Sequence, residues 1–123
     1  MIQGIVTVDR EAVIRLQILD VAGKPTDLDV VIDTGFNGYM TLPMAIIRQH
    51  RLALHGTRSV TLGDGTQVML DIYRATILWM GQPRTVQALA AEGGALIGMA
   101  LLYGYDVSLR VLDGGSVTIT PIP

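Results

Sequence analysis

The sequence predicts an all-β protein. Its 123 residues include 14 glycines, and these separate short runs rich in Val, Ile, Leu and Thr, a pattern typical of many short strands. Half of the residues are hydrophobic and only 16% are charged, a composition typical of a compact globular chain. The length fits one domain. We therefore expect residues 1–123 to form a single all-β domain.

The first predicted strands lie in the N-terminal third. Residues Ala12 to Leu19 alternate in apolar character, and Ala22-Gly23-Lys24-Pro25 is typical of a turn. Val30-Val31-Ile32 is a continuous apolar run, as expected of a strand that is buried on both faces. These observations predict a strand, a turn and a second, more buried strand.

A short helix is predicted from Leu42 to Arg51. Thr41 would lie near its N-cap and Pro43 in its first turn, where a missing N–H is tolerated. We expect Ile46 and Ile47 to face inward from this helix.

The clearest hairpin signal follows. Ser59 to Leu62 and Gln67 to Leu70 are strand-like runs around Gly63-Asp64-Gly65-Thr66, and an Asp-Gly pair between such runs favours a tight turn. Further strands are predicted around turns at residues 80–83 and 113–115, and their ranges are Ala75 to Trp79, Thr85 to Ala90, Asp106 to Leu112 and Ser116 to Thr120.

A weak internal repeat links the two halves of the chain. Gly23-Lys24-Pro25-Thr26 leads through a strand into Val30-Val31-Ile32-Asp33, and Gly81-Gln82-Pro83-Arg84-Thr85 leads through another into Ala95-Leu96-Ile97-Gly98. Each copy is a turn, a strand and an apolar run. A real repeat would give two similar halves around one core, although a match of this kind also arises by chance.

Charge and composition exclude several functions. The net charge of −2 and the scattered basic residues argue against a nucleic-acid partner, which requires clustered Lys and Arg. With no cysteine, disulfides and thiolate chemistry are excluded. The longest apolar run, Ala95 to Tyr105, falls short of the roughly 20 residues of a membrane helix. The start lacks signal-peptide character, so we expect a cytoplasmic protein without a membrane partner.

One short motif carries the candidate chemistry. Asp33 directly follows the apolar run that ends at Ile32 and precedes Thr34-Gly35. A carboxylate at the end of a buried strand is costly unless it is paired, hydrogen-bonded or functional. Gly35 allows a sharp backbone turn, and the Thr34 hydroxyl can bond to a neighbouring chain. The alternative is an ordinary turn that ends a strand.

The context of this motif resembles the aspartic peptidases. Residues 31–35 resemble their active-site loop, in which two apolar residues precede Asp-Thr-Gly, and residues 95–102 resemble their second conserved segment, an apolar pair and a glycine before a short helix. Here that pair and glycine are Leu96, Ile97 and Gly98. The Gly63-Asp64-Gly65 hairpin occupies the place of the flap. The likeness is greatest to small bacterial retropepsin-like proteins, which implies a closed β-barrel with one or two short helices.

The resemblance implies a specific chemistry. Two carboxylates share one proton around a water molecule, one acting as base and the other as acid. Because the chain holds one Asp-Thr-Gly, Asp33 must be supplied twice by a homodimer. Catalysis would use Asp33, Thr34 and Gly35 with no cofactor or metal. A peptide or protein substrate would meet the cleft residue Phe36 and the flap tip, whose residues are Leu62, Gly63, Asp64, Gly65 and Thr66.

The resemblance also predicts an interface and leaves alternatives. Residues Ser116 to Ile122 are expected to supply interface strands, because a lone sheet edge would otherwise be exposed. Phe36, Met99, Ala100 and Asp64 depart from the retroviral pattern, and Phe36 is expected to crowd the floor of the cleft. A homodimeric peptide-binding module without turnover is therefore the alternative function. A third possibility is a structural β-domain in a larger assembly.

Other candidate sites carry less weight. His50 and His55 are wrongly spaced for a helical zinc pair, and we expect both on the surface. Asp27 and Asp29 lie at alternate positions, which favours the solvent-facing side of a strand, although the mouth of a cleft would also suit them.

Overall fold

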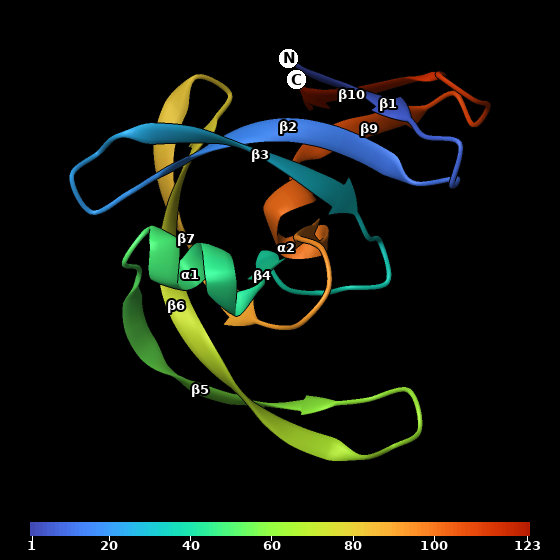
Figure 1. Ribbon diagram of the computed structural model, residues 1–123. Helices are drawn as coiled ribbons and strands as arrows, with labels where there is room; N and C mark the ends of the chain where they lie inside the picture. The colour runs from blue at the N-terminus through green and yellow to red at the C-terminus, as the bar shows by residue number, and fades with distance from the viewer.

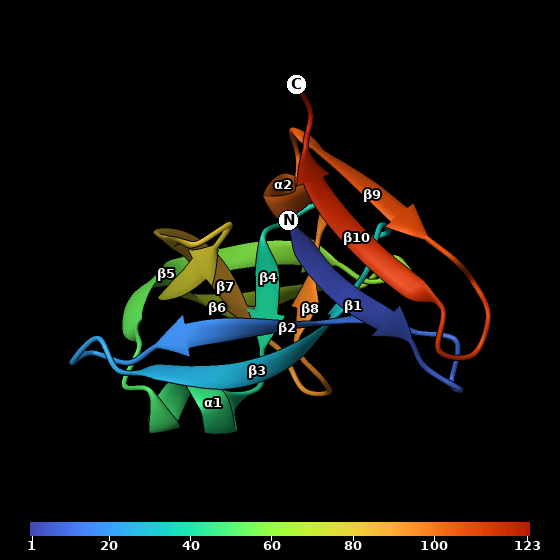
Figure 2. The ribbon, with the colours of Figure 1, turned by 90° about the horizontal axis from the view of Figure 1, so that it is seen from above.

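The computed structural model describes residues 1–123 and confirms the predicted all-β class. Strands hold 55% of the residues and helices 8%. Figures 1 and 2 show two short helices, α1 (Met44–Gln49) and α2 (Met99–Leu102), which lie on opposite sides of the strands. The strands are β1 (Ile2–Val6), β2 (Ala12–Leu19), β3 (Pro25–Ile32), β4 (Met40–Leu42), β5 (Ala53–Thr61), β6 (Gln67–Trp79), β7 (Gln82–Ala90), β8 (Leu96–Ile97), β9 (Tyr105–Leu109) and β10 (Ser116–Pro121).

The ten strands form one sheet that returns on itself. Their order is β5-β6-β7-β4-β8-β3-β2-β1-β10-β9, and an additional antiparallel pairing joins β2 to β6. That pairing places Ile18 opposite Ile77 and joins six strands, β2, β3, β8, β4, β7 and β6, into a ring. The two ends of the sheet, β5 at one side and β9 at the other, keep a free edge.

The ring is built from two interleaved halves, which gives the internal repeat a structural counterpart. Hairpin β2–β3 and hairpin β6–β7 are each followed by a short strand. These short strands exchange places: β8 pairs in parallel with β3, and β4 pairs in parallel with β7. Each hairpin is thus completed by a strand that belongs to the other half.

A single cluster of 19 buried apolar residues fills the ring. The alternation predicted for β2 is confirmed, because Ile14, Leu16 and Ile18 are buried between more exposed neighbours. Opposite strands contribute Ile77, Ile97 and other side chains. Burying each such side chain stabilises the fold by roughly 1.5–3 kcal/mol, so the core also fixes the register of the strands around it.

Helix α1 is shorter than predicted. It spans Met44–Gln49 with Pro43 as its N-cap, not Leu42 to Arg51. Thr41 belongs to β4, where its hydroxyl accepts a hydrogen bond from the N–H of Leu96 at 3.2 Å. The predicted inward face is present, since Ile47 is buried and Ile46 is partly buried against the core. Helix α2 spans Met99–Leu102.

The later strands differ from the predicted ranges at their ends. β6 runs unbroken to Trp79 and β7 begins at Gln82, so the turn is Met80-Gly81 alone. Both turn residues have positive φ, the geometry of a two-residue hairpin turn. The strand predicted to reach Leu112 ends at Leu109, before an irregular connection to β10.

Residues Ser116 to Ile122 are not left with an unpaired edge, which was the reason for expecting interface strands there; their place in an interface stays a prediction. β10 lies between β1 and β9 and pairs with both, which Figure 2 shows as a three-stranded layer beside the main ring. The backbone groups of β10 are therefore used within the chain, and the exposed edge of this layer is β9.

Neither helix has the length and apolar character that crossing a bilayer would need.

Candidate active site

Two parallel strands hold the backbone of Asp33 in place. Asp33 directly follows β3, and its N–H donates to the carbonyl oxygen of Ile97 in β8 at 2.9 Å. Two residues earlier, the N–H of Val31 donates to the carbonyl oxygen of Ala95 at 3.0 Å. The resembling segments around Asp33 and Ile97 are thus direct neighbours in space.

The carboxylate of Asp33 is fixed by its own loop. Its Oδ1 accepts a hydrogen bond from the N–H of Gly35 at 2.9 Å. The main-chain carbonyl oxygen of Asp33 accepts another from the N–H of Phe36 at 3.2 Å. Asp33 is half-buried, whereas Thr34 and Gly35 are exposed. The loop therefore holds a carboxylate near the surface in one orientation and leaves its other oxygen without a protein partner within the chain.

Three successive N–H groups at the start of α2 donate hydrogen bonds to carbonyl oxygens of this loop. Gly98 donates to the carbonyl oxygen of Tyr39 at 3.0 Å, Met99 to that of Phe36 at 2.8 Å and Ala100 to that of Gly38 at 3.1 Å. The first N–H groups of a helix lack partners within the helix, so the loop supplies them. The Asp33 loop and α2 consequently form one rigid unit.

Phe36 is accommodated by two glycines. A Cβ on Gly38 would lie 2.5 Å from the Phe36 ring, and a Cβ on Gly98 would lie 2.5 Å from the ring and from the carbonyl oxygens of Phe36 and Gly38. The ring is half-buried over this surface. Phe36 departs from the retroviral pattern, and the absence of side chains at Gly38 and Gly98 makes room for its ring.

A pocket of about 270 Å³ borders this loop. On one side it is lined by Gly35, Phe36, Asn37 and Gly38, on the other by Arg58, Ser59, Val60 and Thr61 of β5, with Leu89 of β7 also contributing. Figures 1 and 2 both place the tip of the β5–β6 hairpin on the same side of the molecule as the loop after β3. The hairpin and the loop therefore face each other across a hollow.

The structure brings together only some of the predicted site residues. Gly35 and Phe36 line the pocket, while Asp33 and Thr34 adjoin it along the chain. The predicted flap tip, Leu62 to Thr66, does not line it. Its place is taken by strand residues 58–61, which were not among the predicted site residues. No local sequence pattern marks them, because the packed fold decides which part of the hairpin faces the loop.

Asp64 stabilises the turn at the hairpin tip. Its Oδ1 accepts a hydrogen bond from the N–H of Thr66 at 2.8 Å, and the N–H of Leu62 donates to the carbonyl oxygen of Thr66 at 2.7 Å. The bond from Thr66 lowers the pKa of Asp64 below its ordinary value of 3.8. The ionised Asp64 side chain contributes fully to the stability of the turn above pH 3.8. This contribution is lost as the pH falls through the lower pKa of the folded state. The turn is therefore intact in mildly acidic solution.

We expect amides of residues 62–67 to exchange hydrogen quickly in the free protein and slowly when an extended peptide is bound. All six residues are exposed, and a hairpin tip held only by its own turn opens locally at low cost. Hydrogen exchange followed by mass spectrometry measures both states, with the buried segment Ala75–Ile77 as the protected reference. Equal and strong protection of the tip in both states would indicate a fixed hairpin.

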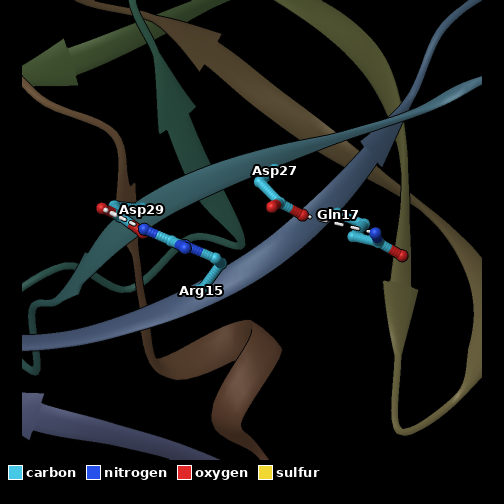
Figure 3. Close-up of polar contacts among 4 residues, drawn as sticks. All are labelled: Arg15, Gln17, Asp27 and Asp29. Atoms are coloured by element: carbon cyan, nitrogen blue, oxygen red, sulfur yellow. Dashed lines mark hydrogen bonds and ion pairs between the residues drawn. The ribbon is translucent and has the colours of Figure 1, made fainter.

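Asp27 and Asp29 lie away from the pocket. Figure 3 shows them on hairpin β2–β3, facing Gln17 and Arg15. The Nε of Arg15 lies 2.9 Å from Oδ1 of Asp29, and this bond lowers the pKa of Asp29. Asp27 accepts a hydrogen bond from Gln17 at 3.3 Å. All four side chains are on the solvent side of the strands, so this cluster is a cross-strand network.

The two histidines do not form a metal site. His50 is buried, which corrects the expectation of a surface residue, and its Nδ1 lies 2.9 Å from the carbonyl oxygen of Ile46. This contact at the end of α1 explains the burial of a polar ring. His55 is exposed on β5. No group of three or more His, Cys, Asp or Glu side chains is arranged to hold a metal ion.

Comparisons with protein-family models, curated proteins and solved structures gave no match to this chain. The geometry of the site and its sequence motifs are therefore what indicates a function for this chain. The geometry comprises a fixed surface carboxylate, a loop locked to α2 and a hairpin strand facing that loop across a pocket.

Proposed function

We propose that this chain is one half of a homodimeric aspartic endopeptidase of the retropepsin-like type. The observation that carries the proposal is the Asp33 loop, in which a carboxylate at the end of β3 is held by β8 and locked to α2 while the loop faces a hairpin strand. The ring of strands then serves as a closed barrel that keeps the loop rigid. Pre-positioned groups of this kind lower the cost of reaching a transition state.

The proposed reaction uses Asp33 from each of two chains. A water molecule bound between the carboxylates loses a proton to the ionised one and attacks the carbonyl carbon of the scissile peptide bond. The protonated carboxyl donates its proton to the carbonyl oxygen. The carboxyl that took the proton from water then donates it to the nitrogen as the C–N bond breaks, and one hydroxyl of the intermediate returns its proton to the other carboxylate, which restores the pair and leaves a carboxylic acid and an amine. The fixed Gly35–Asp33 hydrogen bond orients one oxygen and leaves the other for this water.

Dimer formation is proposed because one chain supplies one Asp-Thr-Gly. Thr34 is exposed beside Asp33, where a two-fold axis would bring it against its own copy. Met99, which donates its N–H to Phe36 in this loop, keeps an apolar side chain 47% exposed. Covering such a side chain is favourable, so the surface next to the loop suits a second copy of the chain.

The pocket suits an extended peptide. β5 is an end strand of the sheet, and β6 is its only partner, so the outer N–H and C=O groups of residues 58–61 are open to a further strand. Adding an extended peptide to such an edge supplies main-chain hydrogen bonds without sequence preference. The same placement would pass a peptide between β5 and the Asp33 loop.

The function is tested by incubating the protein with a mixture of unstructured peptides and identifying new termini by mass spectrometry. Internal cleavage that depends on Asp33 supports an endopeptidase. Stoichiometric peptide binding without any new termini would favour the non-catalytic peptide-binding module.

We expect a dimer, with twice the 13.2 kDa chain mass, in light scattering at high micromolar concentration. Thr34→Arg should give monomers, because two-fold symmetry would place two like charges and two long side chains in one small space. Thr26→Arg, at an exposed position on β3, is the matched control and should remain dimeric. A wild-type protein that stays monomeric with and without a peptide inhibitor contradicts the proposed assembly.

A further inference from the structure

A second pocket lies on the other side of the hairpin base. It encloses about 330 Å³, and its polar lining comes from Tyr39, His55, Arg74, Arg84, Thr85 and Gln87. No Asp or Glu lines it. The residues come from β5, β6 and β7 and from the end of the Asp33 loop, so the pocket spans the base of the β5–β6 hairpin.

The arginines of this pocket have no acidic partner. The one ion pair of the chain joins Arg15 to Asp29, so no carboxylate lies within 4 Å of Arg74 or Arg84. Arg74 instead donates from Nε to Nδ1 of His55 at 3.1 Å. The guanidinium of Arg84 lies 5.9 Å from the centre of the Tyr39 ring. Two arginines of an acidic chain of net charge −2 thus line one pocket without a carboxylate partner.

A β-bulge aims His55 at this pocket. The register of β5 against β6 shifts between Leu54 and Gly56, which leaves His55 without a cross-strand partner. Bulges redirect side chains and occur next to functional sites. Because Nδ1 of His55 accepts the bond from Arg74, a neutral ring carries its proton on Nε2. The ring is then a further donor and orients the Arg74 guanidinium.

We propose that this pocket binds a phosphoryl group. A phosphate carries about −1.5 to −2 charges at pH 7 and three acceptor oxygens, which matches two guanidinium groups better than a single carboxylate does. Guanidinium forks bind such oxygens with paired hydrogen bonds. The amide of Gln87 and the hydroxyl of Tyr39 supply neutral donors at the rim. The volume fits one phosphoryl group with a small substituent. This site is separate from the proposed peptidase reaction.

The test is a titration of ¹⁵N-labelled full-length protein with inorganic phosphate, phosphoserine and acetate at constant ionic strength. We expect saturable amide shifts for residues 84–87 and for His55 with phosphate. Tighter binding of phosphoserine would show that the phosphoryl group arrives on an organic carrier, and equal or weaker binding would show a site for the free anion. Both results support a phosphoryl site. Acetate that binds as tightly as phosphate would overturn it.

Variants separate this site from general charge effects. Arg74→Gln and Arg84→Gln should each raise the Kd for phosphate at least about tenfold, because each removes charge-assisted hydrogen bonds. Arg84→Lys keeps the charge and is the second variant for the case in which Arg84→Gln does not fold. It should also weaken binding, because the guanidinium fork is lost. Arg110→Gln, an exposed arginine elsewhere, is the matched control. Unchanged affinity in the Arg74 and Arg84 variants, or equal loss in the Arg110 variant, would overturn the assignment.

Discussion

Replacing Asp33 with Asn should reduce peptide cleavage by at least about 10³-fold, because the variant removes the general base and acid of both chains at once. The fold should survive, since the Asn side-chain oxygen can still accept the hydrogen bond from Gly35 that Asp33 Oδ1 accepts at 2.9 Å. In the dimer the melting temperature at pH 7 should stay equal or rise, because two facing carboxylates repel each other. Cleavage rates and melting curves for both proteins measure these effects.

A control variant sharpens this test. Asp29→Asn is the matched control, since Asp29 is exposed and pairs with Arg15 outside the pocket. It should cleave as the wild type does. If Asp33→Asn retains wild-type cleavage, the observed hydrolysis has another source and the proposed mechanism fails.

Replacing Gly98 with Ala should destabilise the fold by about 3 kcal/mol. Cleavage should be abolished because the folded site is lost. The added Cβ would lie 2.5 Å from the carbonyl oxygens of Gly38 and Phe36, and these are backbone atoms that accept bonds from α2. Moving them apart would break the hydrogen bonds between the Asp33 loop and the helix. Thermal unfolding should show a melting temperature lowered by roughly 10 °C or more.

Gly94→Ala provides the comparison. A Cβ at Gly94 meets no atom within 4 Å, so this variant should unfold within a few degrees of the wild type. Wild-type stability in both variants would show that the loop tolerates movement away from α2. Equal loss in both would point to glycine flexibility in this region, and not to the close approach at Gly98, as the cause.

The local elements were largely predictable from the sequence, because their signals are local. The alternation in β2 and the turn at Gly63–Thr66 correspond to observed structure. The strand that ends at Ile32 is also present, but burial on both faces is not, because Val31 and Ile32 are only partly buried. The neighbouring placement of Asp33 and Ile97 was not predicted. Nothing in composition or periodicity pairs two segments so distant along the chain, although the hydrogen bond between them fixes the site.

Features that depend on tertiary contacts were missed. The pocket is lined by residues 58–61 and not by the flap tip, because the curvature of β5 and β6 decides which part of the hairpin faces the loop. The strand β10, expected to need a partner chain, pairs with β1 and β9 of its own chain. The burial of His50 depends on a carbonyl of α1. In each case the deciding contact comes from the packed fold and has no local sequence pattern.

The exchange of short strands between the two halves has a consequence for biosynthesis. Val31 pairs with Leu96, 65 positions later (96 minus 31), and such distant pairings form slowly during folding. A nascent chain that has not yet released Ile97 from the ribosome lacks the acceptor that holds the N–H of Asp33. The Asp33 loop therefore becomes ordered only after most of the chain has been synthesised, and truncated translation products carry Asp33 without an assembled loop around it.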